Sequence, residues 1–120
     1  MGRFHDVIHD LRQPTRDLRA AIPGSWAAFS ELQQAAMADG VLPERMKELI
    51  AFAIAVANGC DGCVAYHAQA SAISGATEAE VAEALGVALL MAGGPASVEA
   101  PRAFEAFREF QAALLPGAVG

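Results

Sequence analysis

The feature that most constrains the fold is an uninterrupted apolar stretch of nine residues, Leu49 to Ala57. It follows Pro43 and a polar turn, and it ends at Asn58-Gly59, a pair typical of helix ends. A strand with one face in water would alternate apolar and polar residues, and this stretch does not alternate. Alanine, which is abundant here, favours helix. The stretch therefore predicts a helix over 44–57 that is buried on every side.

The rest of the chain has the same helical character, because its β-branched residues nowhere alternate with polar ones. Pro14 is expected to break the polar first segment, and Ser25 is a candidate N-cap. Thr77 and Glu80 have the spacing of a capping box. We expect an all-α fold, a compact bundle of about five to six helices in one domain spanning residues 1–120. The segments expected to be helical are 4–20, 25–38, 44–57, 60–73, 77–92 and 96–114.

The composition predicts self-association. Hydrophobic residues make up 54% of the chain, and the mean hydropathy is +0.31, which is high for a small domain with much surface for its volume. We therefore expect a homo-oligomer. Five aromatic residues are spaced as helix anchors and are expected in the core or at a subunit interface: Trp26, Phe29, Phe104, Phe107 and Phe110.

Charge and hydropathy also bear on partners and location. A net charge of −6 argues against nucleic acid as a partner. The longest apolar run is too short to span a bilayer, so no membrane association is expected. The first residues have no apolar signal-peptide core, which favours a cytoplasmic location.

Both cysteines of the chain lie in one motif, Cys60-Asp61-Gly62-Cys63, with His67 four residues later and Glu48 twelve residues earlier. On a helix, offsets of three, four and seven residues place Cys60, Cys63 and His67 on one face. A helix N-terminus favours the thiolate form of a cysteine, and a histidine one turn away can accept its proton. Glu48 can complete a relay through His67. These residues predict thiol–disulfide chemistry in which one sulfur captures the oxidised form of the other.

Three other interpretations of the motif remain open. The cysteines can be small buried hydrophobic residues. With Glu48 and His67 they can also form a zinc site, although structural zinc sites usually have a second cysteine- or histidine-rich ligand pair. A thioredoxin fold carries the same Cys-x-x-Cys motif, but it requires β-strands that this sequence does not indicate.

These residues resemble the carboxymuconolactone decarboxylase family, specifically its alkylhydroperoxidase D-like branch. The resemblance covers a core motif at residues 43–95. The matching segments are Lys47-Glu48-Leu49-Ile50, Val56 to His67, Gly75-Ala76-Thr77 and Ala84-Leu85-Gly86-Val87-Ala88. Across the first two segments, Glu48, Cys60, Cys63 and His67 have the family spacing Glu…Cys-x-x-Cys-x-x-x-His.

The resemblance implies an all-α trimer or hexamer that reduces a small hydroperoxide with a cycling dithiol. It implies that Cys63 attacks the peroxide, that Cys60 donates a proton and resolves the product as a disulfide, and that Glu48 and His67 relay protons. It implies no metal, haem or flavin, and a dithiol or lipoyl-type protein as the source of electrons.

One difference from the family pattern separates this chain from well-known members. Those carry a second histidine between the two cysteines, whereas this chain has Asp61-Gly62, so the relay is shorter. The carboxylate of Asp61 is expected to oppose thiolate formation. Two alternative functions stay open: a lactone enzyme of the decarboxylase type, and a non-catalytic redox-sensing or interaction module.

Overall fold

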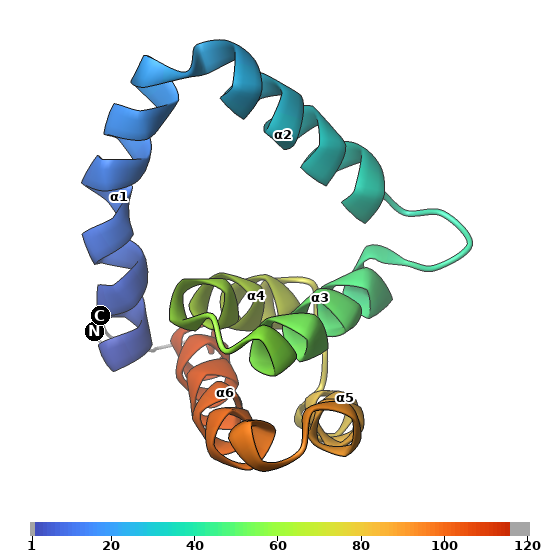
Figure 1. Cartoon of the computed structure of the whole chain (residues 1–120). Coiled ribbons are helices and arrows are strands. Elements are labelled where there is room, and N and C mark those ends of the chain that lie inside the picture. The colour runs from blue at the N-terminus through green and yellow to red at the C-terminus, as the bar shows by residue number, and fades with distance from the viewer. Residues whose placement is uncertain (1, 116–120) are drawn as a thin grey trace.

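Six helices account for nearly all of the ordered structure in the computed structural model, which describes residues 2–115 (Figure 1). There is no strand within that range. The all-α fold and the expected number of helices are therefore confirmed. The helices are α1 (Arg3–Ala21), α2 (Pro23–Met37), α3 (Glu44–Asn58), α4 (Asp61–Ile73), α5 (Glu78–Ala92) and α6 (Gly94–Ala113).

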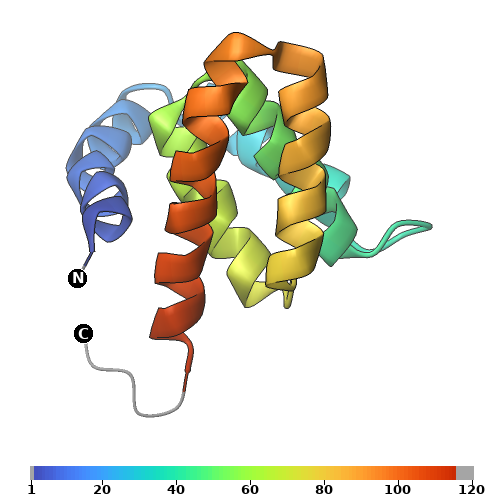
Figure 2. The same ribbon diagram turned by 90° about the horizontal axis from the view of Figure 1, so that it is seen from below.

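The core lies among α3, α4, α5 and α6, and α1 packs on α4 and α6. Its largest fully buried side chains are Phe52, Val56, Val64, Val81 and Phe107. Figure 2 shows α5 and α6 side by side, joined by a tight connection at Gly93, whose φ of 66° is in the left-handed region that favours glycine. Burial of these side chains supplies the main stabilisation of the bundle.

Helix α1 continues through Pro14, so the expected break at this residue is wrong. Proline removes one backbone donor and normally disrupts a helix interior. Here Phe4 and Ile8 anchor the first half of α1 in the core, and the Glu109 carboxylate accepts hydrogen bonds from the backbone N–H groups of Phe4 and His5 at 3.2 and 2.8 Å. The anchored helix extends past the proline to Ala21.

Helix α2 begins earlier than expected. It begins at Pro23, a residue suited to the first helical turn, so Ser25 lies inside the helix and is not its N-cap. It buries none of its residues, and Phe29 is 58% exposed. Figure 1 shows why: α1 and α2 form an arch, and α2 stands away from the bundle. Of the five predicted anchors, only Phe107 and Phe110 are fully in the core, with Phe104 packed against it.

Helix α3 has the predicted extent but is not buried on every side. Leu49, Phe52 and Val56 face the core, whereas Ile50 and Ile54 are about half exposed. Its end is as predicted, because Gly59 has a left-handed conformation with a φ of 68°. The helix therefore has one apolar face in the core and a second one at the surface.

The capping box of α5 is confirmed. The Glu80 N–H donates to the Thr77 hydroxyl at 3.1 Å, and the Thr77 N–H donates to the Glu80 carboxylate at 2.9 Å. The hydrogen bond from the Thr77 N–H, helped by the charge of Arg45, lowers the pKa of Glu80. A lowered pKa in the folded state means that this carboxylate stabilises the fold above its unfolded pKa and loses that effect as the pH falls through its folded pKa.

We predict that Thr77→Ala lowers the free energy of unfolding by about 1 kcal/mol, because the N–H of Glu80 loses its capping acceptor. Thr77→Ser is the matched control, since serine caps as well as threonine. Urea denaturation at neutral pH measures both. Equal losses in the two variants would contradict a capping role for the hydroxyl.

Candidate active site

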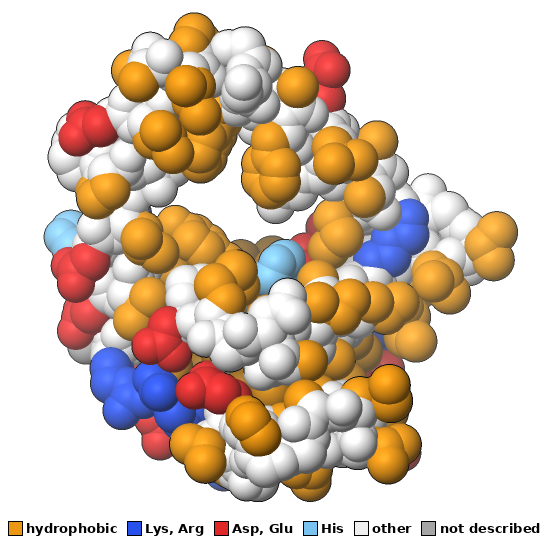
Figure 3. Space-filling view, viewed as in Figure 1, with side chains coloured by type: hydrophobic (Ala, Val, Ile, Leu, Met, Phe, Trp, Pro, Cys, Tyr) orange, Lys and Arg blue, Asp and Glu red, His pale blue; other side chains and the backbone are white. Residues whose placement is uncertain are grey.

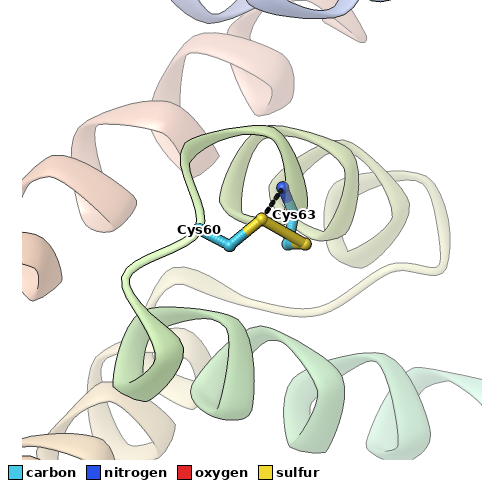
Figure 4. The surroundings of a disulfide bond; sticks show 2 residues. All are labelled: Cys60 and Cys63. Atoms are coloured by element: carbon cyan, nitrogen blue, oxygen red, sulfur yellow. Dashed lines mark hydrogen bonds between the residues drawn. A yellow bond between two sulfur atoms is a disulfide. The ribbon is translucent and has the colours of Figure 1, made fainter.

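The two cysteines lie where the chain turns from α3 into α4. After the left-handed Gly59, Cys60 takes an extended conformation and is the N-cap of α4, and Cys63 is in the first turn. The Cys63 N–H donates to the Cys60 sulfur at 3.2 Å, the dashed line in Figure 4. Their Cα atoms are 5.2 Å apart and the sulfurs form a disulfide. The local fold thus brings the sulfurs together without unwinding the helix.

The two cysteine residues differ in their exposure to solvent. Cys63 is exposed, whereas Cys60 is half-buried and holds the N-cap position. Both lie at the positive end of the α4 dipole, which stabilises a thiolate once the disulfide is reduced. An exposed and stabilised thiolate can attack a substrate, and the less accessible sulfur can then close the disulfide.

One turn farther along α4, His67 pairs with Glu48 of α3. The His67 Nδ1 atom is 2.9 Å from the Glu48 Oε1 atom. The Glu48 side chain is 9% exposed and that of His67 is 27% exposed, so the carboxylate is nearly sealed and the imidazole reaches solvent. A buried carboxylate is costly without a partner, and this histidine is its hydrogen-bond partner. The pair fixes the ring orientation and leaves Nε2 available for proton transfer.

The predicted four residues therefore form two pairs, Cys60 with Cys63 and Glu48 with His67. Within residues 2–115, no hydrogen bond joins either sulfur to His67. Cys63 and His67 are four residues apart on one helix and are therefore neighbours on its surface. A relay between the pairs would need a bridging water or a movement of the Cys63 side chain.

An open groove of about 640 Å³ between α1 and α4 leads to the cysteines. Its floor carries Cys60, Gly62 and Cys63, and α1 supplies its other wall. A Cβ atom on Gly62 would lie only 3.1 Å from the Leu11 side chain, so glycine permits the close approach of α1. Nothing in the motif indicates which distant helix covers the groove, so its α1 residues, Val7, Asp10, Leu11 and Thr15, were not predicted. Tyr66 of α4 also lines the groove.

Comparison with known proteins agrees with this geometry. The family model described as the carboxymuconolactone decarboxylase family matches residues 23–115. The chain belongs to this family. Its fold is similar to the crystal structure of an apo family member from Legionella pneumophila, with a TM-score of 0.88 and 41% identity over 91% of this chain and 97% of that one.

A second crystal structure of the family comes from Thermotoga maritima, and that protein is described as a candidate for a role in the antioxidative response. It matches with a TM-score of 0.74 and 25% identity over 87% of this chain and 92% of that one. An uncharacterized protein of Cupriavidus necator is 41% identical over 75% of this chain and 80% of its own length. Uncharacterized protein 4 in the cox locus of Paracoccus denitrificans is 36% identical over 72% of this chain and 78% of its own length.

Arg102 of α6 also lies at the candidate active site, and the motif gave no indication of it. Its guanidinium lies 3.1 Å from the Asp61 carboxylate and 3.5 Å from that of Glu99. The charge of Asp61, expected to oppose thiolate formation, is therefore partly offset. Arg102 is held by two carboxylates, which leaves it poorly placed to bind the carboxylate of a lactone substrate. The 41-residue separation from Asp61 gives no sequence signal for the contact.

The described part of the chain brings no three His, Cys, Asp or Glu side chains together in a way suited to a metal ion. No helix in that part is both long enough and apolar enough to cross a membrane. The candidate active site is a dithiol next to a carboxylate–imidazole pair, in which Glu48 is nearly buried and His67 reaches solvent.

We predict that His67→Ala lowers the free energy of unfolding by about 2 kcal/mol, because the nearly buried Glu48 carboxylate loses its partner. The double variant Glu48→Gln/His67→Ala should recover part of this loss, since a neutral amide is less costly to bury. Chemical denaturation of the reduced proteins measures both effects. If the loss of unfolding free energy in the double variant equalled the sum of the losses in Glu48→Gln and His67→Ala, the two side chains would not be energetically coupled.

Proposed function

We propose that this protein is a hydroperoxide reductase of the alkylhydroperoxidase D-like branch of its family, working through the Cys60–Cys63 dithiol. The observation that carries the proposal is the disulfide at the start of α4, with both cysteines lining an open groove and the Glu48–His67 pair one helical turn away. A structural disulfide would need no acid–base pair beside it. The combination is suited to repeated oxidation and reduction.

In the first step, the Cys63 thiolate attacks the terminal oxygen of the hydroperoxide. The O–O bond breaks as the S–O bond forms, so sulfur is oxidised to sulfenic acid and the substrate leaves as an alcohol after taking up a proton. The helix N-terminus stabilises the attacking thiolate, and His67, oriented by Glu48, handles the protons.

In the second step, the Cys60 thiol condenses with the Cys63 sulfenic acid. An S–S bond forms, the S–O bond breaks and water leaves with the proton of Cys60. The 5.2 Å separation of the two Cα atoms supports this closure without a large backbone movement. The half-buried position of Cys60 supports its role as the resolving residue rather than as the first nucleophile.

Two electrons from a dithiol partner complete the cycle. A partner thiolate attacks the disulfide, and its second thiol releases the mixed disulfide, which returns both cysteines to thiols and leaves the partner oxidised. A dithiol protein or a lipoyl-type carrier has the required chemistry. The description of the Thermotoga relative agrees with this antioxidant role.

We predict that Cys63→Ser abolishes peroxide-driven thiol oxidation, because the attacking thiolate is removed. Cys60→Ser should instead accumulate a sulfenic acid at Cys63, since no resolving thiol remains. Mass spectrometry after treatment with a sulfenic-acid-trapping dione distinguishes the two variants. Retained oxidation in Cys63→Ser would overturn the proposed roles, and a peroxide-inert wild type would favour the lactone enzyme or the non-catalytic module.

We predict that Glu48→Gln slows peroxide-driven oxidation by about 100-fold, because the amide cannot support proton transfer through His67. The fold should be retained, as circular dichroism would check, since the amide can still hydrogen-bond the imidazole. Glu44→Gln is a suitable control, because Glu44 begins the same helix at an exposed position. Equal rates in wild type and Glu48→Gln would remove Glu48 from the mechanism.

A further inference from the structure

The wall that α1 supplies to the groove over the cysteines is held in place at its start. The Glu109 carboxylate of α6 accepts hydrogen bonds from the backbone N–H groups of Phe4 and His5, so it caps the beginning of α1. Phe4 and Ile8 are buried in the core. The turn of α1 that lines the groove lies directly after these anchors and therefore has a defined position over the cysteines.

The lining of the groove is mostly apolar. The Leu11 side chain comes so close to Gly62, between the two cysteines, that a Cβ atom there would lie 3.1 Å from it. Val7 and Tyr66 line the same space. A reagent that reaches Cys63 through the groove therefore exchanges water for apolar side chains, and a charged group on that reagent loses part of its hydration.

Two carboxylates, those of Asp10 and Asp61, are the charged groups of the groove lining. The charge of Asp61 is partly neutralised by Arg102, whose guanidinium is shared with Glu99. Asp10 is exposed and has no such partner, because none of the salt bridges within residues 2–115 includes it. Asp10 therefore leaves an uncompensated negative charge on the α1 side of the groove.

The arginines of α1 lie on the opposite side of the helix from Asp10. Residues two apart on a helix point in nearly opposite directions, which places Arg12 on the far side. Arg16 and Arg19 share the side of Arg12, at offsets of four and seven residues, and none of the three belongs to the described lining of the groove. Figure 3 shows acidic side chains along the side of the molecule formed by α1, with basic side chains lower on the bundle. The approach to Cys63 is thus negatively charged.

We propose that this groove selects reagents by charge: it admits uncharged reagents to the Cys63 thiolate and slows anionic ones, with Asp10 as the specificity-determining residue. Combined with the proposed function, on which this second step rests, the substrate is an uncharged organic hydroperoxide rather than one that carries a carboxylate. The charge selection itself concerns access to Cys63 and applies to any reagent that attacks a thiolate.

Alkylation of the reduced full chain tests the charge selection, with iodoacetamide as the uncharged probe and iodoacetate as the anionic one. In a Cys60→Ser background Cys63 is the one thiol, and its thiolate displaces iodide from either probe. The ratio of the two rates cancels any change in the amount of thiolate. At an ionic strength of about 0.01 M, Asp10→Asn should lower the iodoacetamide-to-iodoacetate ratio about threefold, and about 1 M salt should remove this difference.

Asp17→Asn is the matched control, because it removes the same charge from the same helix about 10 Å farther along, outside the described groove lining. It should leave the rate ratio close to that of the parent protein. An unchanged ratio in Asp10→Asn, or an equal change in Asp17→Asn, would overturn the charge selection.

A carboxylate-bearing organic hydroperoxide and its methyl ester extend the test to the substrate, because only the acid is charged. The ester should oxidise the reduced wild-type dithiol about threefold faster at low ionic strength, and Asp10→Asn should narrow the difference. Equal rates with acid and ester would overturn the substrate assignment. A wild type inert to both, but with the expected change in alkylation, would refute the proposed function and support the charge selection.

Discussion

The hydrogen bond between Glu48 and His67 is the interaction on which the rest of the site depends. A carboxylate that is 9% exposed on a helix facing the core requires a partner, and His67 supplies it from the neighbouring helix. The hydrogen bond ties α4 to α3 at this point of their packed interface and orients the imidazole. Because the cysteines begin α4, the same contact sets where the dithiol lies relative to the acid–base pair. Stability and chemistry are therefore coupled through one hydrogen bond.

The local elements were predictable because their causes are local. Gly59 ends α3, Thr77 caps α5 and the spacing of Cys60, Cys63 and His67 places them on one helix, all from residues close in sequence. The same logic failed at Pro14, because α1 continues through this residue to Ala21 although its buried anchors, Phe4 and Ile8, lie before the proline.

Contacts between distant elements were not predictable. Arg102 reaches Asp61 and Leu11 covers Gly62 because of how α6 and α1 pack, and no spacing in the sequence encodes either contact. The apolar stretch from Leu49 to Ala57 correctly predicted α3, yet its hydrophobicity could not tell burial in the core from exposure at the surface, as Ile50 and Ile54 demonstrate. Hydrophobicity indicates which side chains avoid water, but not which neighbour covers them.

In the proposed function, the two cysteines form one redox centre that a hydroperoxide oxidises directly. The most direct measurement adds one equivalent of an organic hydroperoxide to the fully reduced wild-type protein and follows its free thiols and intact mass. We expect rapid loss of both thiols, a mass lower by two hydrogens and one equivalent of alcohol, with no other reductant present. Persistence of both thiols would contradict it.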